Sequence, residues 1–167
     1  MADDKTIEIL KSAILMEKRG QALYEKVAQQ TSGNVVKRFF EMMANEEKSH
    51  IRILSEQFKA YQNNKQFDSG DFDDPHESDI TAQVLSREIK SEISASDYEA
   101  AAISAAMSME ERAIKLYSDR AGTATDPNEK ALYNWLAKWE TQHLDFLADI
   151  DRELTEDIWY DQSFWPF

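Results

Sequence analysis

Two short segments of the chain repeat the same pair of chemically versatile residues. "NEEKSHIRIL" holds Glu47 and His50, and "KWETQHLDFL" holds Glu140 and His143. A glutamate and a histidine three residues apart lie on one face of a helix, where both can bind a metal ion. A single Glu-x-x-His pattern is common on solvated helix surfaces, so the surroundings of the two copies decide what they mean.

The two halves of the chain are related by an offset of 93 residues. This shift lays "MEKRGQALY" (16–24) on "MEERAIKLY" (109–117), and it also superposes the two Glu-x-x-His segments. It therefore pairs Glu17 with Glu110. One gapless offset that aligns all of these positions indicates an internal structural repeat.

The segments that carry these residues are predicted to be long α-helices. Only 4 glycines and 3 prolines occur among 167 residues, and apolar or small residues recur at steps of three and four. Asp126 is the predicted N-cap of the last helix, with Pro127 at its first position. Ser96 and Glu99 form a predicted capping box for the third helix. The expected long helices cover about residues 4–30, 35–63, 97–121 and 127–154.

The lengths of the connections predict how these helices are arranged. Short turns within each pair and a long connection between the pairs, residues 64–95, are typical of an all-α antiparallel four-helix bundle made of two hairpins. The connection contains a predicted short helix, residues 80–93, and a 3+1 arrangement around this segment is the alternative. The bundle domain is expected to span residues 1–156, followed by an aromatic tail at 157–167.

The repeated glutamates are expected to lie at one level of the bundle. Glu17 and Glu47 are each 15 residues from the first turn, and Glu110 and Glu140 are each 15 residues from the second. At a rise of about 1.5 Å per residue, all four lie roughly 22 Å from their turns. They occupy the apolar stripes of their helices, and so do the two histidines. The pattern therefore predicts six polar groups that converge inside an apolar core.

Four buried carboxylates cannot all remain ionised beside one another in a medium of low dielectric constant. Protons, internal cations or metal ions could neutralise them. No Lys or Arg occupies the stripes at this level, whereas two divalent ions would cancel four negative charges. Glutamates and Glu-x-x-His motifs from four helices are the ligands of dinuclear metal sites in helical bundles. The predicted metal ligands are Glu17, Glu47, His50, Glu110, Glu140 and His143.

At these residues the chain resembles the ferritin-like superfamily, and in particular its rubrerythrin-type di-iron carboxylate proteins. "MEKRGQALY" and "EEKSH" are similar to signatures of the first two helices of that family, and the likeness covers about residues 5–154. The resemblance implies a ferritin-like bundle with two iron ions, although manganese suits the same ligands. It implies terminal ligands Glu17 and Glu110, bridging ligands Glu47 and Glu140, and one histidine, His50 or His143, on each ion.

Two features depart from the rubrerythrin pattern. Full rubrerythrins carry a cysteine-ligated rubredoxin domain, and this chain has no cysteine, so we expect a member that lacks that domain. Rubrerythrins also share an additional glutamate three residues after the ligand of the third helix, where this chain has Ala113. The set with two Glu-x-x-His motifs is more similar to that of bacterioferritin.

The resemblance implies an oxidoreductase that reduces O2 or H2O2, as a peroxidase or a ferroxidase in oxidative stress or iron handling. Two ferrous ions would give the oxidant one electron each. Without a rubredoxin domain, the electrons would come from incoming Fe(II) or from an external donor. The alternative is an iron storage or delivery protein of the ferritin or bacterioferritin type. A third hypothesis is a partner-binding bundle in which the metal only stabilises the fold.

Composition restricts the partners and the location. A net charge of −13 disfavours binding to nucleic acid and to anionic membrane surfaces, and it attracts cations. No apolar run is long enough to span a membrane, and the acidic N-terminus does not resemble a signal peptide. Because cysteine is also absent, we expect a cytoplasmic protein, and we expect it to be a homodimer.

Several other residues are secondary candidates. Tyr24 and Tyr117 follow the terminal glutamates by two helical turns. Their predicted functional role is to donate a hydrogen bond to a ligand carboxylate or to act as redox-active phenols. The alternative is ordinary packing in the core with the hydroxyl groups satisfied. Glu46 and Glu111 adjoin predicted ligands but point about 100° away from them, so they are predicted to be solvated.

Two segments outside the long helices, the acidic loop and the aromatic tail, are not predicted to take part in the metal site. The acidic loop that precedes His76 lacks the spacing of a calcium-binding loop and is predicted to be solvated, with weak cation affinity as the alternative; its acidic residues are Asp68, Asp71, Asp73 and Asp74. The aromatic tail is expected to dock on the end of the bundle or on a second subunit, because five exposed aromatic rings would form a hydrophobic patch that promotes aggregation. Recognition by another protein is the alternative.

Overall fold

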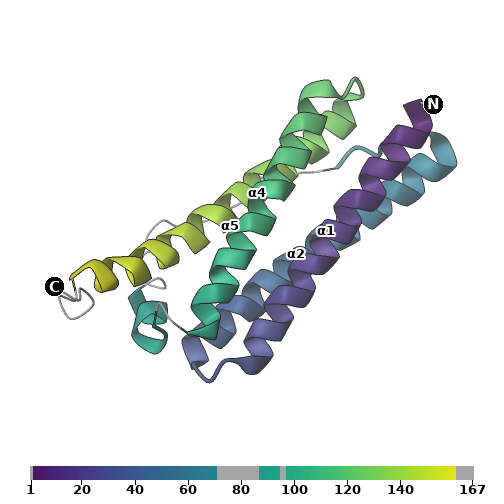
Figure 1. Ribbon diagram of the computed structural model, residues 1–167. Helices are drawn as coiled ribbons and strands as arrows, with labels where there is room; N and C mark the ends of the chain where they lie inside the picture. The colour runs from purple at the N-terminus through teal and green to yellow at the C-terminus, as the bar shows by residue number, and fades with distance from the viewer. Residues whose placement is uncertain (1, 71–86, 95–96, 161–167) are drawn as a thin grey trace.

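Four long helices dominate the computed structural model, which describes residues 2–70, 87–94 and 97–160. One hairpin consists of α1 (Ala2–Gln30) and α2 (Asn34–Asn64). The other consists of α4 (Tyr98–Thr123) and α5 (Pro127–Tyr160). The hairpins lie side by side with their turns at opposite ends (Figure 1). The described residues contain no strand, so the predicted all-α bundle of two hairpins is confirmed.

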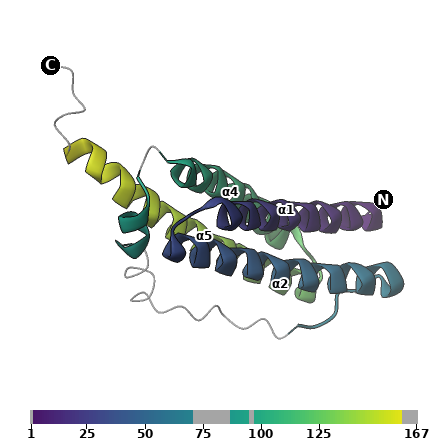
Figure 2. The same ribbon diagram turned by 90° about the horizontal axis from the view of Figure 1, so that it is seen from below.

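The order of the helices across the bundle follows from their contacts. α1 packs along α2 within its hairpin and contacts α4 of the other hairpin. Seen from below, α1 lies between α4 and α2 (Figure 2). Because the turns of the hairpins are at opposite ends, α1 and α4 run antiparallel, and residues near the middle of each helix meet at the same level.

Sequence signals at the helix ends were partly right. Asp126 Oδ1 accepts a hydrogen bond from the backbone N–H of Asn128 at 2.8 Å, so the predicted N-cap of α5 is confirmed. The predicted capping box of the third helix is wrong, because α4 has its N-cap at Asp97, without a side-chain capping bond. Ser96, the residue predicted as the N-cap in that capping box, lies outside the described residues.

α5 ends later than predicted. The helix reaches Tyr160, whereas the periodicity indicated an end near residue 154. The stretch from 154 to 160 has neither glycine nor proline, so nothing in it interrupts the helical backbone. The expected tail therefore begins within α5, and residues 161–167 lie outside the described part of the chain.

The described end of the crossover caps the start of α2. Residues 87–92 are helical, and the rest of the predicted short helix, together with His76 and most of the acidic loop, lies outside the described residues. The Glu92 carboxylate accepts hydrogen bonds from the N–H groups of Val35 and Val36 at 2.9 and 3.0 Å. These are N–H groups that the first turn of a helix leaves unpaired. A side chain at Gly33 would collide with this carboxylate, since a Cβ would lie 2.3 Å from Glu92 Oε2.

The core forms two apolar clusters with a polar level between them. The cluster toward the α1–α2 turn contains Tyr24 and Met43, and the cluster at the other end contains Leu10 and Leu54. Glu17 lies between Leu10 and Tyr24 along α1, and α2 shows the same order around its own buried glutamate. The predicted stripes are confirmed, because their apolar members are buried or partly buried on all four helices.

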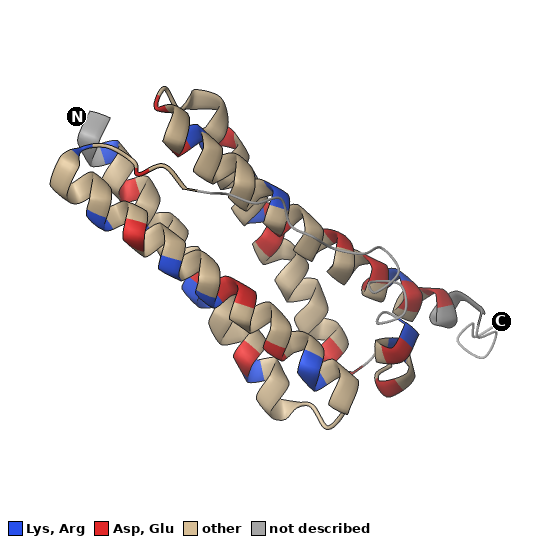
Figure 3. Ribbon diagram, turned by 180° about the vertical axis from the view of Figure 1, so that it is seen from behind, with Lys and Arg blue, Asp and Glu red and all other residues tan. Residues whose placement is uncertain are grey.

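Charged side chains follow the outer faces of the helices. Figure 3 shows a close series of acidic residues along the C-terminal half of α5, which includes Asp145, Asp149, Asp151, Glu153 and Glu156. Such a series contributes to the net charge of −13 and favours cations near this end of the bundle. Within the described residues, no helix is both long and apolar enough to cross a membrane.

One buried ion pair joins three helices near the α4–α5 turn. The guanidinium of Arg120 lies 2.5 Å from Glu129 Oε1 and donates a hydrogen bond to Thr6 Oγ1 of α1 at 3.0 Å. The Arg120 and Glu129 side chains are only 14% and 5% exposed. Removing one partner of such a pair leaves a charge without compensation in the interior.

We therefore expect Arg120→Met to lower the free energy of unfolding by about 3–5 kcal/mol, measured by urea denaturation. Lys115→Met is the matched control on the same helix, because Lys115 pairs with Asp119 on the surface, where both side chains are more than two-thirds exposed. The control should change the free energy of unfolding by less than about 0.5 kcal/mol. Equal losses in the two variants would contradict a special role for the buried pair.

Candidate metal centre

The six predicted ligands meet at one level in the middle of the bundle. α1 and α4 contribute one glutamate each, and α2 and α5 contribute a glutamate and a histidine each. No member is more than 4% exposed. We call the set the Glu/His cluster; it consists of Glu17, Glu47, His50, Glu110, Glu140 and His143.

The Glu/His cluster divides into two overlapping groups of four. One contains Glu17 and His50 and the other contains Glu110 and His143, while Glu47 and Glu140 belong to both. Within each group, one ligand atom from every residue lies within 4.8 Å of the others. Two metal positions with two shared carboxylates have this geometry, which is the arrangement that the family resemblance implies.

The histidines present the same ring atom to the carboxylates. His50 Nδ1 lies 3.1 Å from Glu17 Oε2 and 3.0 Å from Glu140 Oε1. His143 Nδ1 lies 3.1 Å from the other oxygen of Glu140 and 3.7 Å from Glu110 Oε1. Glu140 therefore stands between the two imidazoles, with one oxygen toward each.

One oxygen in the cluster lacks the partner that its burial requires. Glu140 Oε1 is buried and has no hydrogen-bond partner among the described residues, because His50 Nδ1 is close but not aligned for a hydrogen bond. Burying a carboxylate oxygen without a partner is costly. A metal ion between Glu140 and His50 would supply that partner, so the donor set fits a pair of divalent ions.

The two tyrosines cross between the hairpins. The Tyr24 hydroxyl, from α1, donates a hydrogen bond to Glu110 Oε1 of α4, and the Tyr117 hydroxyl, from α4, donates one to Glu17 Oε1 of α1. Both rings are buried, at 1% and 0% exposure. Each tyrosine thus fixes a carboxylate of the opposite hairpin. This geometry agrees with the predicted hydrogen bond from each tyrosine to a glutamate of the cluster.

Protons are the alternative to metal ions as the charges that neutralise the cluster. Burial, followed by the charge of Glu140, raises the pKa of Glu110 to about 8 and raises the pKa of Glu17 well above its usual value. Burial would also raise the pKa of Glu140, but the charge of His50 and the hydrogen bond with His143 lower it. Hydrogen bonds likewise lower the pKa of Glu47 despite burial.

The pKa values of the two histidines are shifted as well. Burial would lower their pKa values, but the charge of Glu140 at His50 and the hydrogen bonds with carboxylates at His143 raise both well above the usual value. Two protonated carboxyl groups, two carboxylates and two imidazolium ions then have no net charge. Two divalent ions would replace the four protons of this state.

Glu46 is partly solvated and lies outside both ligand groups, as predicted, but it also contacts a histidine of the cluster, which was not predicted. Its Oε2 lies 2.7 Å from Nε2 of His143, on the side of the imidazole that faces away from the cluster. The contact joins α2 to α5, so no spacing within a single helix could have indicated it. Glu111 is exposed, in agreement with its prediction.

Aromatic rings cover the histidine side of the cluster. The indoles of Trp135 and Trp139 meet the His50 ring edge-on, with centroids at 5.5 and 5.8 Å. Trp139 also lies 6.1 Å from the ring of His143. These tryptophans were not singled out in the sequence, where they read as ordinary members of an amphipathic helix.

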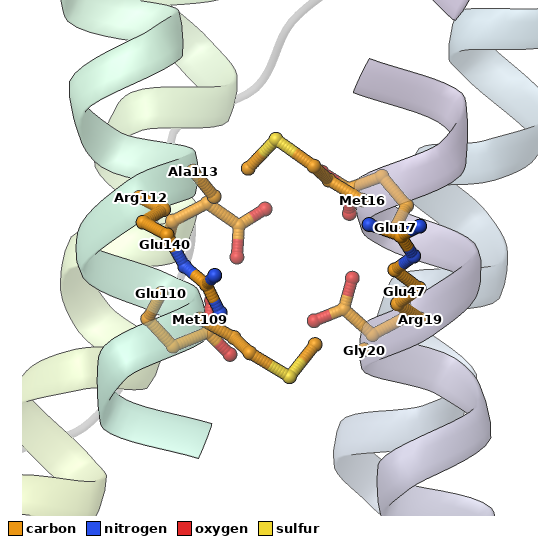
Figure 4. A pocket seen from close by; sticks show the side chains of 10 residues that line it. All are labelled: Met16, Glu17, Arg19, Gly20, Glu47, Met109, Glu110, Arg112, Ala113 and Glu140. Atoms are coloured by element: carbon orange, nitrogen blue, oxygen red, sulfur yellow. The ribbon is translucent and has the colours of Figure 1, made fainter. Parts of the chain in front are cut away.

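A cavity of about 210 Å³ opens on the opposite side, between α1 and α4. Figure 4 shows Met16 reaching across it from α1 and Met109 from α4. The lining residues are related in pairs by the offset of 93, so the cavity lies on the axis that relates the two halves of the chain. The pairs are Met16 and Met109, Glu17 and Glu110, Arg19 and Arg112, Gly20 and Ala113, and Glu47 and Glu140.

A helical bundle with two overlapping Glu/His groups in its interior is the arrangement of the dinuclear carboxylate class of proteins. The rubrerythrin family model matches residues 8–150, and the chain belongs to this family. The searches of curated proteins and of solved structures found no match. The resemblance noted in the sequence is thus confirmed at the level of the family, and the family and the buried cluster together fit a di-metal site.

The raised pKa values predict how stability depends on pH. The folded metal-free protein holds protons on Glu110, Glu17 and the two histidines that the unfolded chain releases at lower pH. Their contribution to stability is therefore lost as pH rises through the folded pKa values. We expect the Tm of the metal-free protein to fall between about pH 5 and pH 9, and bound Co(II) to remove most of this fall. A Tm that rises over this range would contradict the proposed charge state.

Gly20 allows the backbone of α1 to approach Glu47. A Cβ at Gly20 would lie 3.2 Å from Glu47 Cδ, so Gly20→Ala must displace that carboxylate. We expect this variant to bind Co(II) more weakly, measured by calorimetric titration. Gly122→Ala is the control, since a Cβ there meets nothing within 4 Å. It should raise the free energy of unfolding by up to about 1 kcal/mol and leave Co(II) binding unchanged.

Proposed function

We propose that the protein is a di-iron oxidoreductase that reduces H2O2 or O2 at the Glu/His cluster. The observation that carries the proposal is the pair of buried ligand groups that share Glu47 and Glu140. Two metal ions held by these groups would share both carboxylates and could together supply two electrons to one oxidant molecule. Membership of the rubrerythrin family supports the same function.

Iron is the metal we propose, because the family and a redox role both favour it. Carboxylate and imidazole ligands suit iron and manganese alike, so the ligand types do not choose between them. Two ferrous ions would supply one electron each, converting H2O2 and two protons into two molecules of water. The electrons would be restored by an external donor or by further Fe(II).

The residues of the chain have separable tasks in this reaction. Glu47 and Glu140 would bridge the ions, and the terminal glutamates with the histidines would hold one ion each. Tyr24 and Tyr117 fix the terminal carboxylates through hydrogen bonds from the opposite hairpin. This anchoring keeps the ligands in place while the charge of the ions changes.

The size of the cavity between α1 and α4 favours a small substrate. Its volume of about 210 Å³ lies below the range of about 300–1,000 Å³ that is typical of pockets for larger organic ligands. Four of its ten lining residues are glutamates of the cluster, so a molecule inside it faces the carboxylate side of the metal positions. A diatomic or peroxide-sized oxidant fits this route.

Anaerobic loading with Fe(II) and rapid mixing test the proposal. We expect the protein to bind two iron ions per chain and to oxidise both with H2O2 or O2, seen as near-ultraviolet absorption in stopped flow. Glu140→Gln should abolish rapid oxidation, because it removes a carboxylate that both positions share. The exposed neighbour variant Glu111→Gln should react normally. Failure of the loaded protein to react with either oxidant would overturn the proposal.

Iron storage is the second candidate, because two Glu-x-x-His motifs resemble the bacterioferritin set. Light scattering and iron uptake separate the two functions. We expect a homodimer that takes up two iron ions per chain. A large assembly that takes up far more iron than its ligands can hold would favour storage instead.

A further inference from the structure

The two halves of the cluster differ where their histidines face outward. The offset of 93 places Trp139 at the position that corresponds to Glu46. One half thus has a carboxylate beside the histidine of the other hairpin, and the other half has an indole. On the carboxylate side, by contrast, all four glutamates of the cavity correspond in pairs through the same offset.

His143 has a hydrogen-bond partner on each side of its ring. Its Nδ1 faces the cluster, 3.1 Å from Glu140, and its Nε2 lies 2.7 Å from Glu46. A neutral imidazole that binds a metal ion through Nδ1 must carry its proton on Nε2, and this N–H then donates a hydrogen bond to the Glu46 carboxylate. Such an acceptor fixes the orientation of the ring and makes the metal-binding nitrogen a stronger donor.

His50 has a different outer environment. Its carboxylate contacts within the described residues, to Glu17, Glu47 and Glu140, all involve Nδ1. The ring is flanked edge-on by the indoles of Trp135 and Trp139. An indole N–H can only donate a hydrogen bond, so Trp139 cannot accept a hydrogen bond from an imidazole N–H as the Glu46 carboxylate can.

We propose that Glu46 is a positioning residue that makes the two metal positions unequal, so that the position with His143 binds a divalent ion more tightly than the position with His50. This inference rests on the metal-binding part of the proposed function. It assigns the first ion bound to one half of the cluster and leaves the more weakly held ion beside the two tryptophans. The side chain of Glu46 is 29% exposed, so it lies between the histidine and solvent.

Titration of the metal-free protein with Co(II), followed by visible absorption and calorimetry, tests this inequality. We expect the wild type to bind two ions in two resolved steps. Glu46→Gln keeps the size of the side chain but removes its charge, and Glu46→Ala also removes the acceptor. Both should weaken the first step, by about 10–100-fold for Glu46→Ala, while the second step changes little.

Glu111→Gln is the matched control, because Glu111 also adjoins a predicted ligand and is exposed. It removes the same charge without touching a histidine, so both steps should keep their wild-type affinity. Thermal unfolding of the metal-free variants measures any change in the fold itself. A loss of affinity without a loss of metal-free stability supports a role in positioning.

Proton NMR of the Co(II)-loaded protein gives a readout that a structural role would not change. Each bound histidine contributes one exchangeable, strongly shifted N–H signal. Glu46→Gln should move one of the two signals and speed its exchange with water, while the other stays in place.

The inference is overturned by two equal steps in the wild type, by equal weakening of both steps in the Glu46 variants, or by the same effect in the control. Absence of any Co(II) binding would overturn the proposed function as well. Two bound ions with affinities that do not depend on Glu46 would overturn only this inference.

Discussion

The burial of four carboxyl groups and two imidazoles at one level of the bundle is the constraint on which the rest of the structure depends. A low-dielectric interior does not tolerate four neighbouring negative charges, so their charge must be cancelled. Protons on Glu17, Glu110 and the histidines can cancel it, and so can two divalent ions. The apolar clusters above and below this level hold the helices together.

The Glu/His cluster has a carboxylate side and a histidine side, and both halves of the internal repeat contribute residues to each side. The cavity between α1 and α4 lies on the axis that relates the halves of the chain, and it exposes the carboxylates to small molecules. The histidines and tryptophans of α2 and α5 cover the other side. Two differences between the halves lie at the site: Glu46 corresponds to Trp139, and Gly20, where a Cβ would lie 3.2 Å from Glu47 Cδ, corresponds to Ala113.

Much of the fold could be predicted, because helix formation and amphipathic burial leave local signals. The stripes, the turns and the N-cap at Asp126 depend on residues a few positions apart. The helix ends were less predictable. α5 extends to Tyr160 because no residue stops it earlier, and the cap of α4 moved to Asp97 because several residues near a helix start can fill that position.

The sequence alone determined which six side chains would share one level, since the repeat offset and the distances to the turns place them there. Only the tertiary structure decided what surrounds them. The bonds from Tyr24 and Tyr117 cross between α1 and α4, and the contact of Glu46 with His143 crosses between α2 and α5. Such contacts depend on the rotation and separation of the two hairpins, and these are set by how whole helix faces pack, which spacing along one helix does not encode.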